Sequence, residues 1–239
     1  KYHKILLIAE QGLGDTLQFI RYVKLLRDEG KVIFLWAPKP LHTIIKQSKL
    51  VDKFLTFEES TNFTDGCYLP LMSLPSLFGI PYKNTLSNTS YFKTSKNSDK
   101  KWFKNFSYEQ KNIIGIHWQG NPEQEISDWI KNKRSFALSC FTPLSRIDNI
   151  SLVSLQKGYG SEQLNNCEFK NKFVKAQEEI NDIWDFAEIA SIIKNCNLII
   201  TSDSAVAHLA GGLGVETWLL LKYLPDWRWE VKGDQTLWY

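Results

Sequence analysis

A short glycine-containing corner near the start of the chain brings together residues whose types and spacing are typical of anion binding. The corner is "AEQGLGDTLQF", residues 9–19. Gly12 and Gly14 follow an apolar run and precede an amphipathic stretch, which is the position of the phosphate-binding turn in nucleotide-binding folds. Asp15 stands where its carboxylate either caps the following helix or faces a ligand. The corner alone leaves both interpretations open.

The spacing of this corner argues against the two best-known phosphate-binding motifs. A dinucleotide fingerprint needs a third glycine, and that position is Leu17. It also needs an acidic residue after the second strand, which here runs into Pro38. No Gly-Lys-Ser/Thr sequence follows the corner, so it is not a Walker loop. A nicotinamide or flavin cofactor is therefore not expected.

A second anion-binding pattern occurs in "TSDSAVAHLAGGLGVETWLLL", residues 201–221. Good N-capping residues come after an apolar run, and a helix of small residues follows, so its N-terminus can approach a ligand closely. The free N–H groups and positive dipole of such a helix favour a diphosphate. His208 lies one turn into the helix, either as a core histidine or as a ligand contact. The candidate ligand-binding residues here are Ser202, Asp203, Ser204, Ala205 and His208.

Further polar residues follow other predicted strands, in "HWQGNPEQ" (117–124), "NKRSF" (132–136) and "SLQKG" (154–158). The two basic side chains among them are suited to charge-assisted hydrogen bonds with phosphate, although surface loops also carry such residues. The candidates are Trp118, Gln119, Gly120, Asn121, Arg134, Gln156 and Lys157. Trp227, Arg228 and Trp229 are candidates for the rim of the same cleft.

Composition excludes several other classes of protein. The chain has four histidines and no His-Glu-x-x-His or Asp-x-Asp motif, so no metal site is expected. A net charge of +3, without interleaved basic and aromatic residues, gives no sign of nucleic-acid binding. The four cysteines stand far apart, which favours reduced thiols in a cytoplasm. No apolar run approaches the ~20 residues that a transmembrane helix needs.

Short apolar runs alternate with stretches of helical period, which predicts an α/β protein with mostly parallel sheets. The expected strands are 4–9, 31–37, 53–57, 67–71, 112–118, 151–155, 172–174, 197–201 and 216–221. The expected helices are 15–28, 40–47, 141–147, 183–195 and 204–212. Residues 82–101, rich in Asn, Ser, Thr and Lys, read as a linker. The hypothesis is therefore two Rossmann-like lobes, residues 1–100 and 101–239, facing a cleft at the carboxyl ends of their strands.

With these residues in view, the chain resembles the ADP-heptose–lipopolysaccharide heptosyltransferase-like superfamily. It is most similar to the glycosyltransferase domains that follow tetratricopeptide repeats in bacterial proteins. The segments that carry the resemblance are "AEQGLGDTLQFIRYV", "CYLPLMSLPSLFGI", "IGIHWQGNP", "KRSF", "LVSLQKG", "DFAEIASIIKNCNLIITSDSAVAHLAGGLG" and "PDWRW". Together they span nearly the whole chain.

The resemblance implies a GT-B fold and metal-independent sugar transfer. The nucleotide-diphosphate sugar would bind mainly to the second lobe, and the acceptor would be a glycan, a lipopolysaccharide-like molecule or a protein. It assigns Asp15 as catalytic base, Arg134 as a phosphate contact, and Asp203, Ser204, Ala205 and His208 as donor contacts. A cytoplasmic location, or a peripheral one at the inner face of the membrane, follows from the same likeness. The alternative is a non-catalytic nucleotide- or protein-binding module beside a scaffold of repeats.

Overall fold

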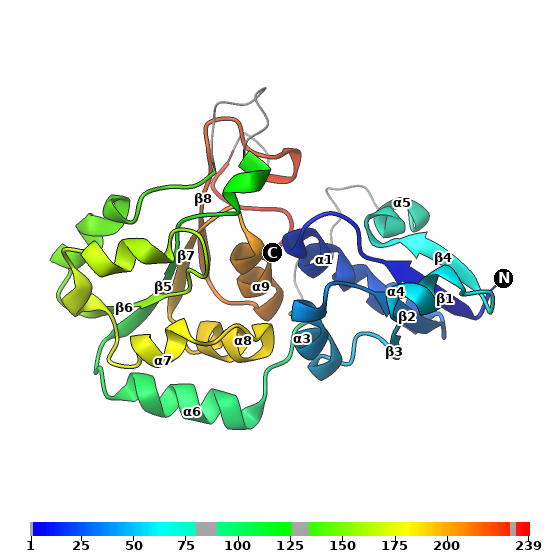
Figure 1. Cartoon of the computed structure of the whole chain (residues 1–239), viewed down its shortest axis with the longest axis horizontal. Coiled ribbons are helices and arrows are strands. Elements are labelled where there is room, and N and C mark those ends of the chain that lie inside the picture. Colours follow the sequence, from blue (N-terminus) through cyan, green and yellow to red (C-terminus); the bar gives the residue numbers. More distant parts are fainter. Residues whose placement is uncertain (1, 80–89, 126–133, 230–232) are drawn as a thin grey trace.

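The computed structural model describes residues 2–79, 90–125, 134–229 and 233–239. It contains two lobes, each built on a parallel sheet of four strands. Figure 1 shows the lobes side by side, with α1 (Leu13–Phe19) of the first next to α9 (Ala205–Leu213) of the second. The predicted fold class, an α/β protein with two Rossmann-like lobes, is confirmed.

The first lobe has the strand order β3-β2-β1-β4. Its strands are β1 (Lys4–Ile8), β2 (Val32–Trp36), β3 (Lys53–Phe54) and β4 (Cys67–Pro70). The chain crosses from β1 to β2 on one side and returns to pair β4 on the other. Ligands of open parallel sheets bind where the strand order reverses in this way, beyond the carboxyl ends of the strands. The end of β1 and the start of α1 (Leu13–Phe19) lie at that point.

The second lobe repeats this arrangement with the order β6-β5-β7-β8. Its strands are β5 (Asn112–His117), β6 (Ile150–Ser154), β7 (Leu198–Ser202) and β8 (Thr217–Leu220). Strands β5 and β6 are almost wholly buried, as their continuous apolar sequences require of strands covered on both faces. The reversal point falls between the carboxyl ends of β5 and β7.

The remaining helices cover the two sheets. The first lobe carries α2 (Val23–Asp28), α3 (His42–Gln47), α4 (Phe57–Thr61) and α5 (Leu74–Leu77). The second carries α7 (Gln177–Asn181), α8 (Phe186–Lys194) and α9 (Ala205–Leu213), with a long 3-10 segment at Leu138–Arg146. No helix in the described part of the chain combines the length and apolar character needed to span a bilayer.

The predicted linker at 82–101 is wrong at its C-terminal end, and residues 80–89 lie outside the described residues. Helix α6 (Lys96–Ser107) begins inside it. The helix was not predicted because it has a polar surface and few apolar residues. Trp102 and Phe106 are nevertheless buried, and the Trp102 indole N–H donates to Glu188 of α8 at 2.7 Å. The predicted lobe boundary at residue 100 falls within this helix and stays a prediction.

Three smaller predictions are also corrected. The helix expected over 15–28 is interrupted by a 3-10 turn at Ile20–Tyr22, which separates α1 from α2. The strand expected over 172–174 is a single bridge between Leu152 and Phe173. Residues 141–146 of the helix expected over 141–147 lie within the 3-10 segment, which contains Pro143 and so cannot form every α-helical hydrogen bond.

The lobes meet where α9 packs on α1 and where α8 packs on α3, and the approach at α9 is especially close. A Cβ atom on Gly14 of α1 would lie 2.9 Å from Cδ2 of His208, so only glycine permits this approach. On another side of α9, the backbone N–H groups of Tyr91 and Phe92 donate to the carbonyl of Gly212 at 2.9 and 3.1 Å. The chain that enters the second lobe is thereby fixed to the same helix. The end of the chain also lies there, beside α9 and α1 (Figure 1).

Candidate functional site

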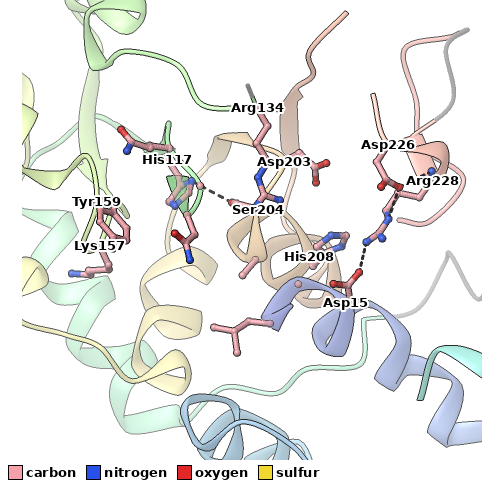
Figure 2. A pocket seen from close by; sticks show the side chains of 16 residues that line it. Asp15, His117, Arg134, Lys157, Tyr159, Asp203, Ser204, His208, Asp226 and Arg228 are labelled. Carbon is pink, nitrogen blue, oxygen red and sulfur yellow. Dashed lines mark hydrogen bonds and ion pairs between the residues drawn. The ribbon is translucent and has the colours of Figure 1, made fainter. Parts of the chain in front are cut away.

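A cavity of about 390 Å³ lies between the lobes, at the carboxyl ends of both sheets. The first lobe contributes the start of α1. The second contributes the residues after β5, β6 and β7, the start of α9, and the segment after β8. Figure 2 shows these side chains around the cavity. The predicted site residues that line it are Gly14, Asp15, Gln119, Gly120, Asn121, Arg134, Lys157, Asp203, Ser204, Ala205, His208 and Arg228.

Both carboxylate oxygens of Asp15 are engaged. The backbone N–H of Gly12 donates to Oδ2 at 2.9 Å, which is the helix-capping contact expected at this position. The Oδ1 atom lies 2.8 Å from Nη1 of Arg228 (Figure 2). The two side chains are only 17% and 12% exposed. The capping interpretation of Asp15 is therefore confirmed, and the same carboxylate also lines the cavity.

Arg228 holds the segment after β8 against the first lobe. Its Nε atom lies 2.8 Å from Oδ1 of Asp226, and its Nη1 also donates to Oε1 of Gln18 at 3.0 Å. Burial disfavours the charged guanidinium, but Asp15 and Asp226 more than offset this and raise the pKa of Arg228 above its ordinary value. A permanent cation therefore sits at the junction of the two lobes.

Across the cavity, Ser204 precedes α9 in an extended conformation, but its side chain does not cap the helix. Its hydroxyl instead lies 3.2 Å from Nδ1 of His117 and 3.3 Å from the hydroxyl of Thr201. Helix α9 therefore starts at the cavity wall without a side-chain cap from Ser204, and backbone N–H groups in its first turn are suited to an anion.

Two buried histidines line the cavity as neutral groups. Burial lowers the pKa of His117 to about 3, and the nearby Arg134 acts in the same direction. Burial also lowers the pKa of His208 well below its ordinary value, helped by Arg228, Arg21 and Arg134. Each ring can therefore offer one N–H and one lone pair at neutral pH, without adding charge.

The cationic side chains of the second lobe differ in their availability. Arg134 pairs with Glu125 (Nε to Oε1, 3.5 Å), and a Cβ on Gly120 would lie 2.8 Å from the Arg134 Nε. Gly120 thus makes room for the guanidinium at the cavity. Lys157 lines the cavity, but its ammonium group donates to the carbonyl of Ile180. Burial lowers the pKa of Lys157 to about 8, against the opposing effect of Asp182.

Gln156 and Trp118 support the cavity wall and do not line it. The Gln156 side chain accepts from the backbone N–H groups of Trp118 and Gln119 at 3.1 and 2.9 Å, and it donates to the carbonyls of Gln119 and Tyr159. The Trp118 indole N–H donates to Gly160 at 3.2 Å. These bonds fix the loops after β5 and β6 relative to each other.

The other predicted residues lie close to the cavity but outside its lining. Gly12 and Ser202 adjoin lining residues, while Trp227 is 59% exposed. Trp229 is buried, and its ring stacks on His208 with a centroid distance of 5.3 Å. The lining residues that the sequence did not single out are Leu13, His117, Tyr159 and Asp226. Each adjoins, or lies two residues from, a residue that was predicted, so a wider window around each motif includes them.

No protein-family model matches the chain, and no curated protein matches its sequence. Solved structures do match. The glycosyl transferase family 9 protein from Veillonella parvula DSM 2008 has a TM-score of 0.66 at 12% identity, over 92% of this chain and 81% of that one. Escherichia coli ADP-heptose lipopolysaccharide heptosyltransferase II gives 0.58 at 15% identity, over 90% and 84%. E. coli heptosyltransferase WaaC, solved with ADP-2-deoxy-2-fluoro heptose, gives 0.60 at 9% identity, over 90% and 88%.

The chain has the fold of these three proteins. The likeness inferred from the sequence is thus confirmed at the level of the fold, a GT-B-like arrangement of two lobes around a cleft. At these identities the comparison assigns no residue of this heptosyltransferase-like fold to a role.

Proposed function

We propose that the chain is a glycosyltransferase that moves a sugar from a nucleotide-diphosphate donor to a hydroxyl group of a glycan, lipopolysaccharide-like or protein acceptor. The observation that carries this proposal is the composition of the 390 Å³ cavity between the lobes. It joins the carboxylate of Asp15 in the first lobe to the start of α9 and to Arg134 in the second. The heptosyltransferase-like fold supports it, because WaaC was solved with an ADP-sugar analogue.

The donor diphosphate would bind to the second lobe. The start of α9 offers backbone N–H groups and the positive end of the helix dipole, both of which favour a diphosphate. Arg134 would add charge-assisted hydrogen bonds. His117 and His208 are neutral and would donate or accept hydrogen bonds without a charge of their own. The ammonium group of Lys157 is bonded to Ile180, so its contribution would be smaller.

Asp15 would act as the general base for the acceptor. Its carboxylate has about four lone-pair sites, of which Gly12 and Arg228 take two, so others remain for a hydroxyl proton. The acceptor oxygen would bond to the anomeric carbon of the donor while the bond from that carbon to the diphosphate breaks. The hydroxyl proton would pass to Asp15, and the nucleoside diphosphate would leave with both bonding electrons. Arg134 and α9 would stabilise its developing charge.

The proposal includes transfer without a metal ion. Within the described residues, no three or more His, Cys, Asp or Glu side chains come together as metal ligands. The cations near the cavity are guanidinium and ammonium groups, which would take the place of a metal at the diphosphate. Nucleotide binding should therefore be unchanged by a chelator. If a chelator weakens nucleotide binding and Mg²⁺ or Mn²⁺ restores it, this part of the proposal is wrong.

Two further parts of the proposal concern the surroundings of the protein. We place it in the cytoplasm or at the inner face of the membrane, where nucleotide sugars are made. Neighbouring tetratricopeptide repeats are suggested by the sequence likeness, and they stay a prediction. Cell fractionation tests the location, and the sequence of the complete gene product tests the repeats.

The function is tested with a thermal-shift panel of nucleoside diphosphates and their sugars. A ligand at 100 times its dissociation constant stabilises the folded state by about 2.7 kcal/mol, which raises Tm by roughly 5–10 °C in a chain of this size. Arg134→Ala should weaken binding about tenfold or more, through loss of a charge-assisted contact. Arg146→Ala, the same change at an exposed position, is the control. If no nucleotide raises Tm, or if Arg134→Ala binds nucleotide as tightly as Arg146→Ala, the proposed donor site is wrong.

A further inference from the structure

The side chain of Tyr239 lies at the junction of the lobes and contacts both. Its hydroxyl lies 2.7 Å from Nδ1 of His208. Its ring lies against α9 at Gly211, where a Cβ atom would come within 2.4 Å of the ring. On the side of the first lobe, the guanidinium of Arg21 lies 4.4 Å from the ring centroid. Tyr239 is therefore held in place by its ring, independently of its hydroxyl group.

The imidazole ring of His208 is also held in place by its neighbours. It is 2% exposed, and its ring stacks on Trp229 at an interplanar angle of 24°. One ring nitrogen, Nδ1, faces Tyr239. The other, Nε2, lies toward Gly14, because a Cβ built on that glycine would be 3.5 Å from it. Both His208 and Gly14 line the cavity, so this edge of the ring belongs to the cavity wall.

Because the imidazole of His208 is neutral, the group at Nδ1 decides what Nε2 presents. If Nδ1 accepts a hydrogen bond from the Tyr239 hydroxyl, then Nε2 carries the N–H and is a donor. If Nδ1 donates instead, then Nε2 is an acceptor and repels an anion. Burial raises the pKa of the Tyr239 phenol well above its ordinary value, so its proton stays in place. The Tyr91 hydroxyl is a second neighbour of the Tyr239 hydroxyl. Its oxygen already accepts from Nη2 of Arg21 at 3.2 Å, so Nδ1 of His208, at 2.7 Å, is the better acceptor for the Tyr239 proton.

We propose that Tyr239 is a positioning residue that acts through His208. Its O–H donates to Nδ1, fixes the tautomer with hydrogen on Nε2, and so presents a neutral N–H donor to an anionic group in the cavity. That the anion is the donor diphosphate rests on the proposed function. The tautomer itself does not depend on it. A neutral donor is suited to this place, because a charged imidazolium would be buried beside the cations of Arg228 and Arg134.

The tautomer is measured directly by NMR of histidine labelled with ¹⁵N in the ring. The chain has four histidines, and His208→Leu identifies the signals of His208. We expect a protonated Nε2 and an unprotonated, hydrogen-bonded Nδ1. Tyr239→Phe keeps the ring and removes the oxygen, so the Nδ1 resonance should move. Tyr223→Phe, the same change at a residue that is 89% exposed, should leave it in place. A protonated Nδ1 in the wild type, or an unmoved Nδ1 signal in Tyr239→Phe, would overturn the proposal.

The consequence for binding is measured with inorganic pyrophosphate and with the nucleoside diphosphate that binds best. Loss of one hydrogen bond predicts about two- to tenfold weaker binding by Tyr239→Phe. In a His208→Leu background the same change should cost nothing more, because Tyr239 acts through the histidine. Additive losses, or an affinity equal to that of Tyr223→Phe, would contradict the proposed role in binding. If the wild type binds neither ligand, the proposed function fails, while the NMR result still decides the tautomer.

Discussion

Nη1 of Arg228 lies 2.8 Å from Oδ1 of Asp15, an ion pair that joins the segment after β8 to the glycine corner of the first lobe. Arg228 is held in turn by Asp226 and Gln18. The lobes are therefore connected across the cavity by charged groups as well as by the packing of α1 on α9. The proposed base and a cation suited to phosphate therefore lie in direct contact.

Removal of this cation should destabilise the protein strongly. Arg228→Ala leaves two carboxylates without their partner in a site where both Arg228 and Asp15 are less than a fifth exposed. Removal of one partner of a buried ion pair lowers the free energy of unfolding by about 3 kcal/mol or more. Lys24→Ala breaks an exposed pair with Asp28, in which the side chains are 64% and 57% exposed, and should cost at most about 0.5 kcal/mol. Urea unfolding compares the two. Equal losses would show that the Arg228 pair contributes no more than a surface contact.

The close approach of the lobes at Gly14 gives a second prediction. Gly14→Ala places a methyl group 2.9 Å from Cδ2 of His208, whose ring is fixed by Tyr239 and Trp229. Overpacking of this kind costs about 1–3 kcal/mol, although alanine is the better helix former by up to about 1 kcal/mol. We therefore expect a net loss of stability and weaker nucleotide binding.

The matched control for this variant is Gly12→Ala, at the other glycine of the same corner. Its nearest contact would be Oδ2 of Asp15 at 3.3 Å, so its effect should be smaller. Denaturation and nucleotide titration of the two variants give the comparison. A Gly14→Ala protein that is more stable than the wild type would show that the lobes do not meet closely at this residue.

The buried neutral histidines predict a loss of stability in acid. The pKa of His117 is about 3 when folded and about 6.5 when unfolded, so between these values the unfolded chain binds the extra proton. The free energy of unfolding should fall by about 1.4 kcal/mol per pH unit for this group as the pH drops below about 6.5. His208, whose pKa is also lowered, adds to the slope.

Urea unfolding between pH 7 and pH 5 measures this slope. His117→Gln should make it shallower, because glutamine does not titrate. His3→Gln, the same change at an exposed histidine, should leave the slope as it is. A wild-type slope that His117→Gln does not alter would mean that His117 binds protons equally in the folded and unfolded chain, which would contradict its lowered pKa.

Most strands and their carboxyl ends could be predicted from the sequence because they are continuous apolar runs that end in a polar loop, whereas β3 is only Lys53–Phe54 and the strand expected at 172–174 is a single bridge. Runs such as "KILLI" and "LIITS" became β1 and β7 with ends within one or two residues of those expected. A parallel sheet brings such ends to one edge, so Asp15, Asp203 and Arg134 could be placed at one cleft. Helix α6 could not be predicted in this way, because its stability comes from Trp102 and Phe106 packing on the second lobe.

The contacts that define the site could not be predicted from the sequence, for a different physical reason. The pairs Asp15–Arg228 and His208–Tyr239 join segments that no local pattern relates. Arg228 and Trp229 were predicted as rim residues from their neighbours in the chain, but their partners depend on how the segment after β8 crosses to the first lobe. Lys157 has the right position and charge for phosphate, yet only the structure shows its bond to Ile180.

The central claim is that Asp15 accepts the proton of an acceptor hydroxyl, and Asp15→Asn tests it most directly. Asparagine can still accept from Gly12 but cannot take the proton, while Asp28→Asn makes the same change at an exposed position. The measurement is the rate at which nucleoside diphosphate is released from the donor that binds best, with acceptor present. We predict a rate 10²- to 10⁴-fold lower in Asp15→Asn, equivalent to roughly 3–5.5 kcal/mol of barrier, with nucleotide affinity retained. A rate equal to that of Asp28→Asn would contradict the claim and leave Asp15 as a helix cap and ion-pair partner only.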